Sequence, residues 1–202
     1  MKHIFKEGLP NHPTLLLLHG TGGSENDLLP IAEMIDPDAN VLSVRGNINE
    51  NGLSRFFKRL REGVFDEEDL VKQTDSLNDF LDQASQDYQF DREQVVAIGY
   101  SNGANIAGSL LFHYEKPLKG AILHHPMVPR RGLTLPDQNQ LPVFIGAGTN
   151  DPLCPVDETK ELDELLSNAN AKVKVEWVDQ GHQLSRQEVQ SAKQWYEENL
   201  LN

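Results

Sequence analysis

The segment Gly99-Tyr100-Ser101-Asn102-Gly103 constrains the fold of this chain more than any other part of it. Residues 94–98, just before it, form a short apolar run typical of a strand buried on both faces. After it, apolar residues recur at helical spacing, at Ala104, Ala107, Leu110, Leu111 and Tyr114. A G-x-S-x-G pattern between strand and helix holds the serine hydroxyl clear of the backbone and leaves no room for a Cβ at either glycine. We therefore predict a sharp turn that exposes Ser101, and a plain turn that happens to contain serine is the alternative.

The rest of the chain alternates strand-like and helix-like segments with short connections, which predicts an α/β fold with a mainly parallel central sheet flanked by helices. The expected strands are residues 14–19, 41–45, 94–99, 120–124, 142–147 and 172–178. The expected helices are residues 27–35, 67–88, 102–114, 157–169 and 186–200. Ser185 and Glu188 have the spacing of a capping box at the start of the last helix. Neither a repeat nor a linker-like segment interrupts the pattern, so we expect one domain over residues 1–202.

Charge and hydropathy narrow the classes of partner. The net charge is −13 and no basic run exceeds Arg130-Arg131, so nucleic acid and anionic membranes would be repelled. The longest aliphatic run, residues 15–18, is far too short to span a membrane, and the first residues do not resemble a signal peptide. A single cysteine, Cys154, excludes an internal disulfide and is interpreted as structural. We expect a cytoplasmic protein without membrane insertion.

Ser101 needs a base, because a serine hydroxyl is a poor nucleophile near neutral pH. Histidine suits this role, since its ordinary pKa is about 6.5. Of the seven histidines, His182 is the best candidate, because it lies on a loop between the last expected strand and the last expected helix, next to Gly181. His124 and His125 end another expected strand and could also approach Ser101.

The base in turn needs an acid that fixes its tautomer. Asp151 follows an apolar strand through Gly148-Thr149-Asn150, which places it at the carboxyl end of the sheet. Asp179 is the alternative, and Asp157 is interpreted as a helix N-cap. The resulting chain order, serine, then aspartate, then histidine, is the order typical of α/β-hydrolases.

An ester hydrolase also needs two donors for the oxyanion. The N–H of Asn102 is one candidate, and the loop His19-Gly20-Thr21-Gly22-Gly23 supplies the other. We expect the Thr21 N–H to serve, with Gly22 as the alternative. The loop lacks the G-K-[ST] ending of a phosphate-binding P-loop. No histidine and carboxylate grouping has competing metal-ligand spacing, so we expect neither a metal nor a cofactor.

Four motifs together resemble the phospholipase/carboxylesterase family of the α/β-hydrolases, which includes acyl-protein thioesterases: Leu18-His19-Gly20-Thr21-Gly22-Gly23, the serine motif, Gly148-Thr149-Asn150-Asp151-Pro152 and Gly181-His182. The chain is most similar to a bacterial subgroup of hydroquinone-induced carboxylesterases, through Ser43-Val44-Arg45-Gly46 and Leu123-His124-His125-Pro126-Met127-Val128-Pro129. The resemblance implies Ser101 as nucleophile, Asp151 as acid and His182 as base, and a homodimer. The chain departs from many members at Asn102, where they carry Gln.

These observations predict a serine carboxylesterase that acts on a small-molecule ester through an acyl-enzyme intermediate. Residues 125–140, between two expected strands, are too few for a large helical lid, which favours small or medium acyl groups. The candidates for the substrate pocket are Gly22, Phe56, Phe57, Met127 and Leu153. The alternatives are a thioesterase or lysophospholipase that uses the same three residues, and a ligand-binding α/β-hydrolase without activity.

Overall fold

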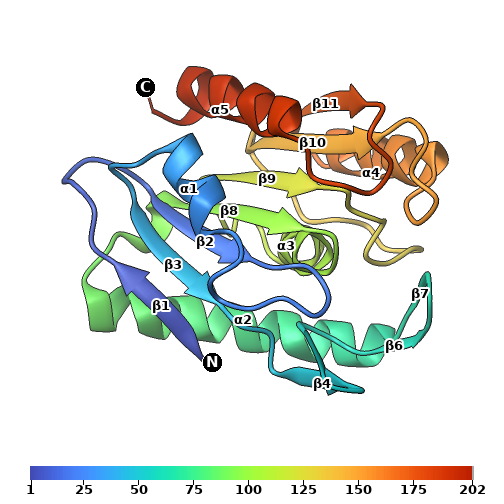
Figure 1. The fold of residues 1–202 in the computed structure, drawn as a ribbon, viewed down its shortest axis with the longest axis horizontal. Helices are drawn as coiled ribbons and strands as arrows, with labels where there is room; N and C mark the ends of the chain where they lie inside the picture. The colour runs from blue at the N-terminus through green and yellow to red at the C-terminus, as the bar shows by residue number, and fades with distance from the viewer. Residues whose placement is uncertain (202) are drawn as a thin grey trace.

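The computed structural model describes residues 1–201, in which a seven-stranded sheet is covered by helices on both faces (Figure 1). The strand order is β1-β3-β2-β8-β9-β10-β11. Strand β1 pairs with β3 in antiparallel register, and every other pair in this sheet is parallel. The strands are β1 (His3–Lys6), β2 (Thr14–Leu18), β3 (Asn40–Val44), β8 (Val95–Tyr100), β9 (Gly120–His124), β10 (Pro142–Gly148) and β11 (Lys172–Val178).

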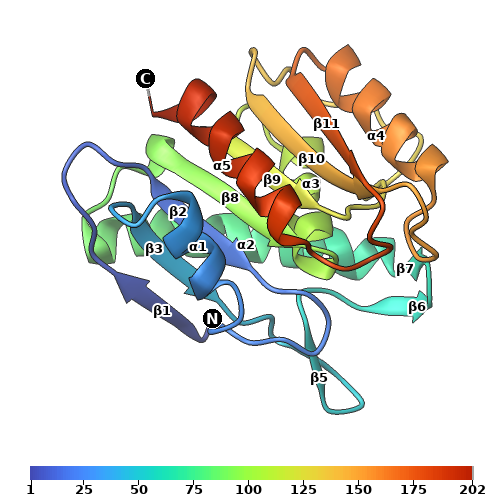
Figure 2. The same ribbon diagram turned by 45° about the horizontal axis from the view of Figure 1, so that its top comes forward.

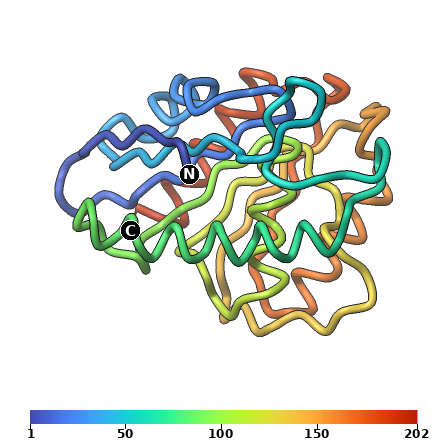
Figure 3. Tube along the Cα trace, turned by 90° about the horizontal axis from the view of Figure 1, so that it is seen from below, coloured from blue at the N-terminus to red at the C-terminus, as the bar shows by residue number. Residues whose placement is uncertain are grey.

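In the part of the chain that the structure describes, two helices cover one face of the sheet and three cover the other. The first face carries α1 (Leu29–Ile35) and α5 (Arg186–Leu200), which lie toward the viewer in Figure 2. The second face carries α2 (Glu67–Tyr88), α3 (Asn102–His113) and α4 (Val156–Asn168). Helix α2 runs across the molecule beneath the sheet (Figure 3). A short 3-10 helix, η1 (Arg92–Gln94), leads into β8.

The run of four leucines in β2 divides between the two cores. Successive side chains of a strand point to opposite faces of the sheet. Leu15 and Leu17 therefore pack with α1 and α5, whereas Leu16 and Leu18 pack with α2, α3 and α4. All four side chains are buried, which explains why this central strand is apolar without alternation.

All the expected strands and helices are present, and their ends differ from the predictions by at most a few residues. The sequence pattern missed the edge strand β1 and two small hairpins. The hairpins are formed by β4 (Ile48–Glu50) with β5 (Leu53–Arg55) and by β6 (Arg59–Arg61) with β7 (Val64–Phe65). Strands of two or three residues are too short to show a recognisable alternation of polar and apolar side chains.

One helix begins differently from the prediction. We expected Asp157 to be the N-cap of its helix, but α4 begins at Val156 with Pro155 at the N-cap position. Asp157 instead lies in the first turn, where a negative charge interacts favourably with the helix dipole. The N-cap interpretation was therefore wrong, although the acidic residue still favours this end of the helix.

The loops that follow the parallel strands all begin at the same edge of the sheet, where the carboxyl ends of these strands lie. Ser101 follows β8, His125 follows β9, Asp151 follows β10 and His182 follows β11. In open α/β sheets, ligands bind at the carboxyl ends of the strands. Within residues 1–201, no helix has the length and apolar character that a membrane-spanning segment needs.

Candidate active site

Ser101 occupies a strained turn between β8 and α3. Its φ of 52° and ψ of −111° are rare for a residue with a side chain, and such strain is concentrated at functional sites. A Cβ on Gly99 would lie 2.6 Å from Cα of Ala104, and a Cβ on Gly103 would lie 1.9 Å from the carbonyl oxygen of Leu18. The close approach of helix and strand therefore requires both glycines, as the sequence predicted.

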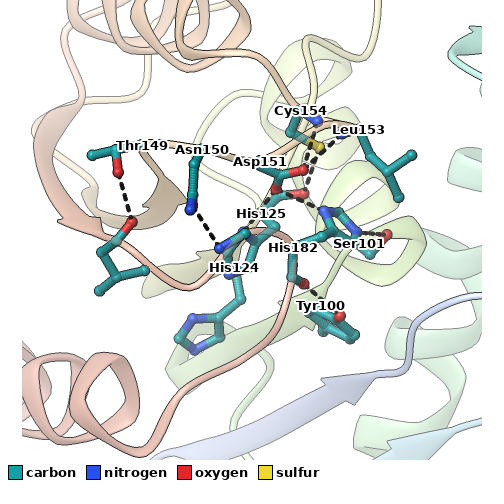
Figure 4. A network of polar contacts seen from close by, with 12 residues as sticks. Tyr100, Ser101, His124, His125, Thr149, Asn150, Asp151, Leu153, Cys154 and His182 are labelled. Carbon is teal, nitrogen blue, oxygen red and sulfur yellow. Dashed lines mark hydrogen bonds and ion pairs between the residues drawn. The ribbon is translucent and has the colours of Figure 1, made fainter.

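The structure brings together the three residues that the sequence selected (Figure 4). Nε2 of His182 lies 2.9 Å from Oγ of Ser101, and Nδ1 of His182 lies 2.7 Å from Oδ2 of Asp151. An ionised carboxylate only accepts hydrogen bonds, so Nδ1–H donates to Asp151 and Nε2 can accept the Ser101 proton. Asp179, the alternative acid, is exposed and instead accepts a hydrogen bond from the Thr149 hydroxyl.

The Asp151 carboxylate accepts four hydrogen bonds. Oδ1 accepts from the backbone N–H groups of Leu153, at 2.8 Å, and Cys154, at 3.0 Å. Oδ2 accepts from His182 and also from Nδ1 of His125, at 3.0 Å. Burial raises the pKa of Asp151, but the Cys154 N–H, the His182 ring and the other donors lower it by more, so it lies below its ordinary value. The group is therefore held ionised near neutral pH.

Two residues that we did not predict hold the His182 loop in place. The Tyr100 hydroxyl donates to the His182 carbonyl at 2.7 Å, and the Gly181 N–H donates to Oδ1 of Asn150 at 2.7 Å. A Cβ on Gly148 would lie 2.2 Å from the Gly181 carbonyl oxygen, so the close approach of this loop to β10 requires a glycine there. Tyr100 and Asn150 each adjoin a predicted site residue, which is the only sequence signal for their role.

The loop after β2 favours Thr21 over Gly22 as an oxyanion donor. The Gly22 N–H already donates to the Ser54 carbonyl at 2.8 Å, so it is engaged by the β4–β5 hairpin. The Thr21 hydroxyl accepts a hydrogen bond from the buried Arg55 guanidinium at 2.6 Å, which fixes this residue. The Asn102 side chain accepts from the Phe56 N–H at 2.7 Å, which anchors the other candidate donor.

His19 stabilises the same loop as a neutral ring. Its Nδ1–H donates to the Gly20 carbonyl at 2.6 Å, and its Nε2 accepts from the Gly46 N–H at 3.1 Å. Burial lowers the pKa of His19, which favours the uncharged ring that these two hydrogen bonds require. His19 therefore links the loop after β2 to the loop after β3.

A cavity of about 410 Å³ opens beside Ser101 and His182. The predicted pocket residues Met127 and Leu153 line it, as do side chains of the two hairpins. Its lining comprises Thr21, Arg55, Arg59, Glu62, Gly63, Phe65, Tyr100, Ser101, Asn102, Asn105, Met127, Pro152, Leu153, Cys154 and His182.

Three of the predicted pocket residues lie elsewhere. Phe56 and Phe57 are 2% and 0% exposed and pack in the core with α2 and α3. Gly22 lines an adjacent hollow together with Thr21 and Tyr100. The prediction of Phe56 and Phe57 as pocket walls was wrong, because the chain after β5 turns both rings into the core while Arg55 and Phe65 face the cavity.

The capping box formed only in part. The Ser185 hydroxyl accepts from the Glu188 N–H at 3.1 Å, as predicted, but the Glu188 carboxylate is fully buried and does not return to the helix N-terminus. The carboxylate instead contacts Nδ1 of His124 and lies 3.1 Å from Nε2 of His125. A Cβ on Gly146 would lie 1.9 Å from this carboxylate, so a glycine in β10 makes the space for it. Burial raises the pKa of Glu188, but the two histidines lower it by more, so that it lies at about 2.

A mainly parallel sheet, a serine on a strained strand-to-helix turn, and an acid and a histidine after later strands define an α/β-hydrolase. The chain belongs to the phospholipase/carboxylesterase family, whose model matches residues 1–200. It is therefore an enzyme of the carboxylic ester hydrolase class.

Individual relatives agree with this assignment. The chain is 58% identical over 201 residues to the protein MhqD of Bacillus subtilis, with 100% of both chains covered. It superposes on the crystal structure of the Bacillus cereus carboxylesterase with a TM-score of 0.97 and 62% identity, covering 98% of this chain and 94% of the other. It is also 27% identical over 161 residues to acyl-protein thioesterase 1 of Cryptococcus neoformans, covering 69% of this chain and 66% of the relative.

Replacing Glu188 with Gln should destabilise the protein by about 3–5 kcal/mol at pH 7, because His124 and His125 lose a buried ionised partner. The lowered pKa of Glu188 means that this stabilisation is fully present above about pH 4.5 and is lost as the pH falls toward 2. The difference in free energy of unfolding between wild type and E188Q should therefore shrink across this window in denaturant titrations.

The matched control is E197Q on the exposed side of the same helix, which should change stability by only a few tenths of a kcal/mol. If the difference in free energy of unfolding between E188Q and wild type stayed constant from pH 6 to pH 3, this would contradict the assignment of an ionised, buried Glu188.

Proposed function

We propose that the protein is a serine carboxylesterase that hydrolyses small or medium carboxylic esters through an acyl-enzyme intermediate. The observation that carries this proposal is the continuous hydrogen-bonded chain from Ser101 through His182 to Asp151, with distances of 2.9 and 2.7 Å, at the wall of a cavity of about 410 Å³. Nucleophile, base and orienting acid are in the geometry that acyl transfer needs.

Acylation would begin when Oγ of Ser101 attacks the ester carbonyl carbon as Nε2 of His182 takes the hydroxyl proton. The negative charge that develops on the carbonyl oxygen would be stabilised by the N–H groups of Thr21 and Asn102. Asp151 would stabilise the imidazolium of His182, which then protonates the departing alkoxide. An alcohol leaves, and the acyl group stays on Ser101.

Deacylation would repeat these steps with water as the nucleophile. His182 takes a proton from the water as it attacks the acyl carbon, and the same two N–H groups bind the second oxyanion. Collapse of the intermediate returns the proton to Oγ of Ser101 and releases the carboxylic acid. The four hydrogen bonds on Asp151 keep it ionised throughout, so it orients His182 without taking the proton.

The size of the cavity and the short connection between β9 and β10 support small or medium acyl groups. Residues 125–141 hold no helix, and Met127, Leu153 and Phe65 supply a limited apolar wall. The likeness to the Bacillus cereus carboxylesterase supports an oxygen ester as substrate. The relationship to acyl-protein thioesterase 1 keeps a thioester as the second candidate, and turnover of matched oxygen esters and thioesters separates the two.

A fluorophosphonate probe should label the protein once, on Ser101, because its strained turn presents the hydroxyl to His182 at 2.9 Å. Intact mass should rise by one adduct, and peptide mapping should place it on Ser101. The variant S101A should remain unlabelled, whereas S24A, which changes a half-buried loop serine hydrogen-bonded to Asp27, should label like wild type. Labelling that persists in S101A would overturn the assignment of the nucleophile.

Catalysis should proceed on dissolved esters, with kcat/KM highest for acyl chains of about two to eight carbons, because burial of longer chains requires more apolar surface than this cavity offers. The net charge of −13 also disfavours adsorption to anionic lipid surfaces. Rates on p-nitrophenyl esters of increasing chain length, below and above the critical micelle concentration, test this. A steady rise to sixteen carbons, or a jump at micelle formation, would instead favour a lysophospholipase.

A further inference from the structure

His125 lies directly behind the candidate triad and makes hydrogen bonds with both of its ring nitrogens. Nδ1 is 3.0 Å from Oδ2 of Asp151, which is the oxygen that also receives His182. Nε2 is 3.1 Å from Oε2 of Glu188. The ring is buried and lies between two buried carboxylates.

The backbone of His125 is as constrained as its ring. Its φ of 53° lies in the left-handed region, which costs energy for a residue with a side chain. Its N–H donates to the Gly146 carbonyl at 2.7 Å, and its carbonyl accepts from the Cys154 thiol at 3.3 Å. The fold therefore maintains a strained conformation that aims this ring at Asp151.

The two partners of His125 determine its protonation. A neutral imidazole has one N–H donor and one acceptor nitrogen, and an ionised carboxylate only accepts. Both nitrogens of His125 face carboxylate oxygens, so both hydrogen bonds form only when the ring is an imidazolium. Burial lowers the pKa of His125, but Glu188 and Asp151 raise it by more, so it lies above its ordinary value.

Within residues 1–201, the charged and titratable groups that surround His125 come from five elements. Tyr100 at the end of β8 and His124 at the end of β9 adjoin it. Asp151 and Cys154 approach from the loop after β10, Glu188 from α5, and His182 from the loop after β11. Of these groups, the two carboxylates carry the negative charge that stabilises a positive His125 ring. The centroid of the His182 ring lies 5.2 Å from the centroid of the His125 ring.

We propose that His125 is a positioning residue, held as an imidazolium between Asp151 and Glu188, which fixes the orientation of Asp151 and lowers the basicity of His182. This inference rests on the proposed function, because it assigns His182 as the base. The positive His125 ring and the His182 ring share Oδ2 of Asp151. Because their centroids are 5.2 Å apart, a positive charge on His125 disfavours a positive charge on His182. A positive His125 ring therefore makes a positive charge on His182 less favourable than an uncharged neighbour would.

The protonation of His125 can be read without any activity measurement. In ¹⁵N spectra of the histidine rings of the full chain, both nitrogens of His125, assigned by the loss of its signals in H125N, should be protonated at pH 7. The ring should lose one of these protons only above the ordinary pKa of histidine, because deprotonation breaks one of two buried charged hydrogen bonds. An unprotonated ring nitrogen on His125 at pH 7 would overturn the proposal.

The variant H125N tests the effect on His182. Asparagine tolerates a positive φ, and its amide can donate to Asp151 from the position of Nδ1, but it carries no charge. The acidic limb of kcat/KM against pH should move to higher pH in H125N, because the loss of a neighbouring positive charge makes the charged form of His182 more favourable. The matched control H113N, in helix α3, should leave the limb unchanged.

A second variant separates positioning from stability. H125N leaves Glu188 with a single partner and should lower Tm, whereas H125N/E188Q removes that carboxylate and should recover part of the loss. In both variants, the acidic limb of kcat/KM against pH should lie at higher pH than in the wild type. A lower Tm with an unmoved limb in both variants would show that His125 is only structural.

The outcome for His125 is separable from the outcome for the proposed function. If Ser101 is not labelled by a fluorophosphonate, the proposed function fails, and the ¹⁵N spectra still report whether His125 is an imidazolium. If Ser101 is labelled but His125 is neutral at pH 7, the proposed function stands and the present inference fails.

Discussion

The Asp151 carboxylate is the group on which the rest of the site depends. It lies in a buried position, where an ionised carboxylate is unfavourable unless hydrogen bonds compensate for the lost hydration. Two backbone N–H groups bind one of its oxygens, and the rings of His182 and His125 bind the other. Each of these donors comes from a loop that follows a strand, so the sheet itself assembles the hydrogen bonds.

A chain of alternating acids and bases extends from the surface of the cavity into the protein. It runs from Ser101 through His182 and Asp151 to His125 and then to Glu188. With His125 positive, the two carboxylates and one imidazolium carry one net negative charge. In the proposed reaction, Asp151 would stabilise the imidazolium that His182 forms during acyl transfer, whereas a positive His125 ring makes that imidazolium less favourable than Asp151 alone would.

The parts of the site that the sequence predicted are those set by local pattern and chain order. A strand before Ser101, a helix after it and a strand before Asp151 are visible as apolar runs. The requirement for two glycines around Ser101 follows from local sterics, and the structure agrees with it at Gly99 and Gly103.

The parts that could not be predicted depend on contacts between distant segments. Glu188 has the spacing of a capping residue, and nothing near it in sequence reveals the space that Gly146 leaves for its carboxylate. Phe56 and Phe57 flank a charged segment, and only the packing of the hairpins against α2 and α3 decides which side chains face the cavity. The sequence shows only that His125 is one of two histidines at a strand end. Its role depends on where the fold places two carboxylates, those of Asp151 and Glu188, which are distant in sequence.

In the proposed triad, Asp151 orients His182, and no other acid near it does so. Paired measurements of kcat for D151N and D179N, with folding checked by circular dichroism, test it most directly. We expect D151N to lower kcat by about 10⁴-fold, as when a triad acid is neutralised and the base takes the wrong tautomer, whereas D179N stays near wild type. A large loss in D179N with D151N near wild type would contradict the role of Asp151, because the hydrogen bonds that converge on it would then have no part in catalysis.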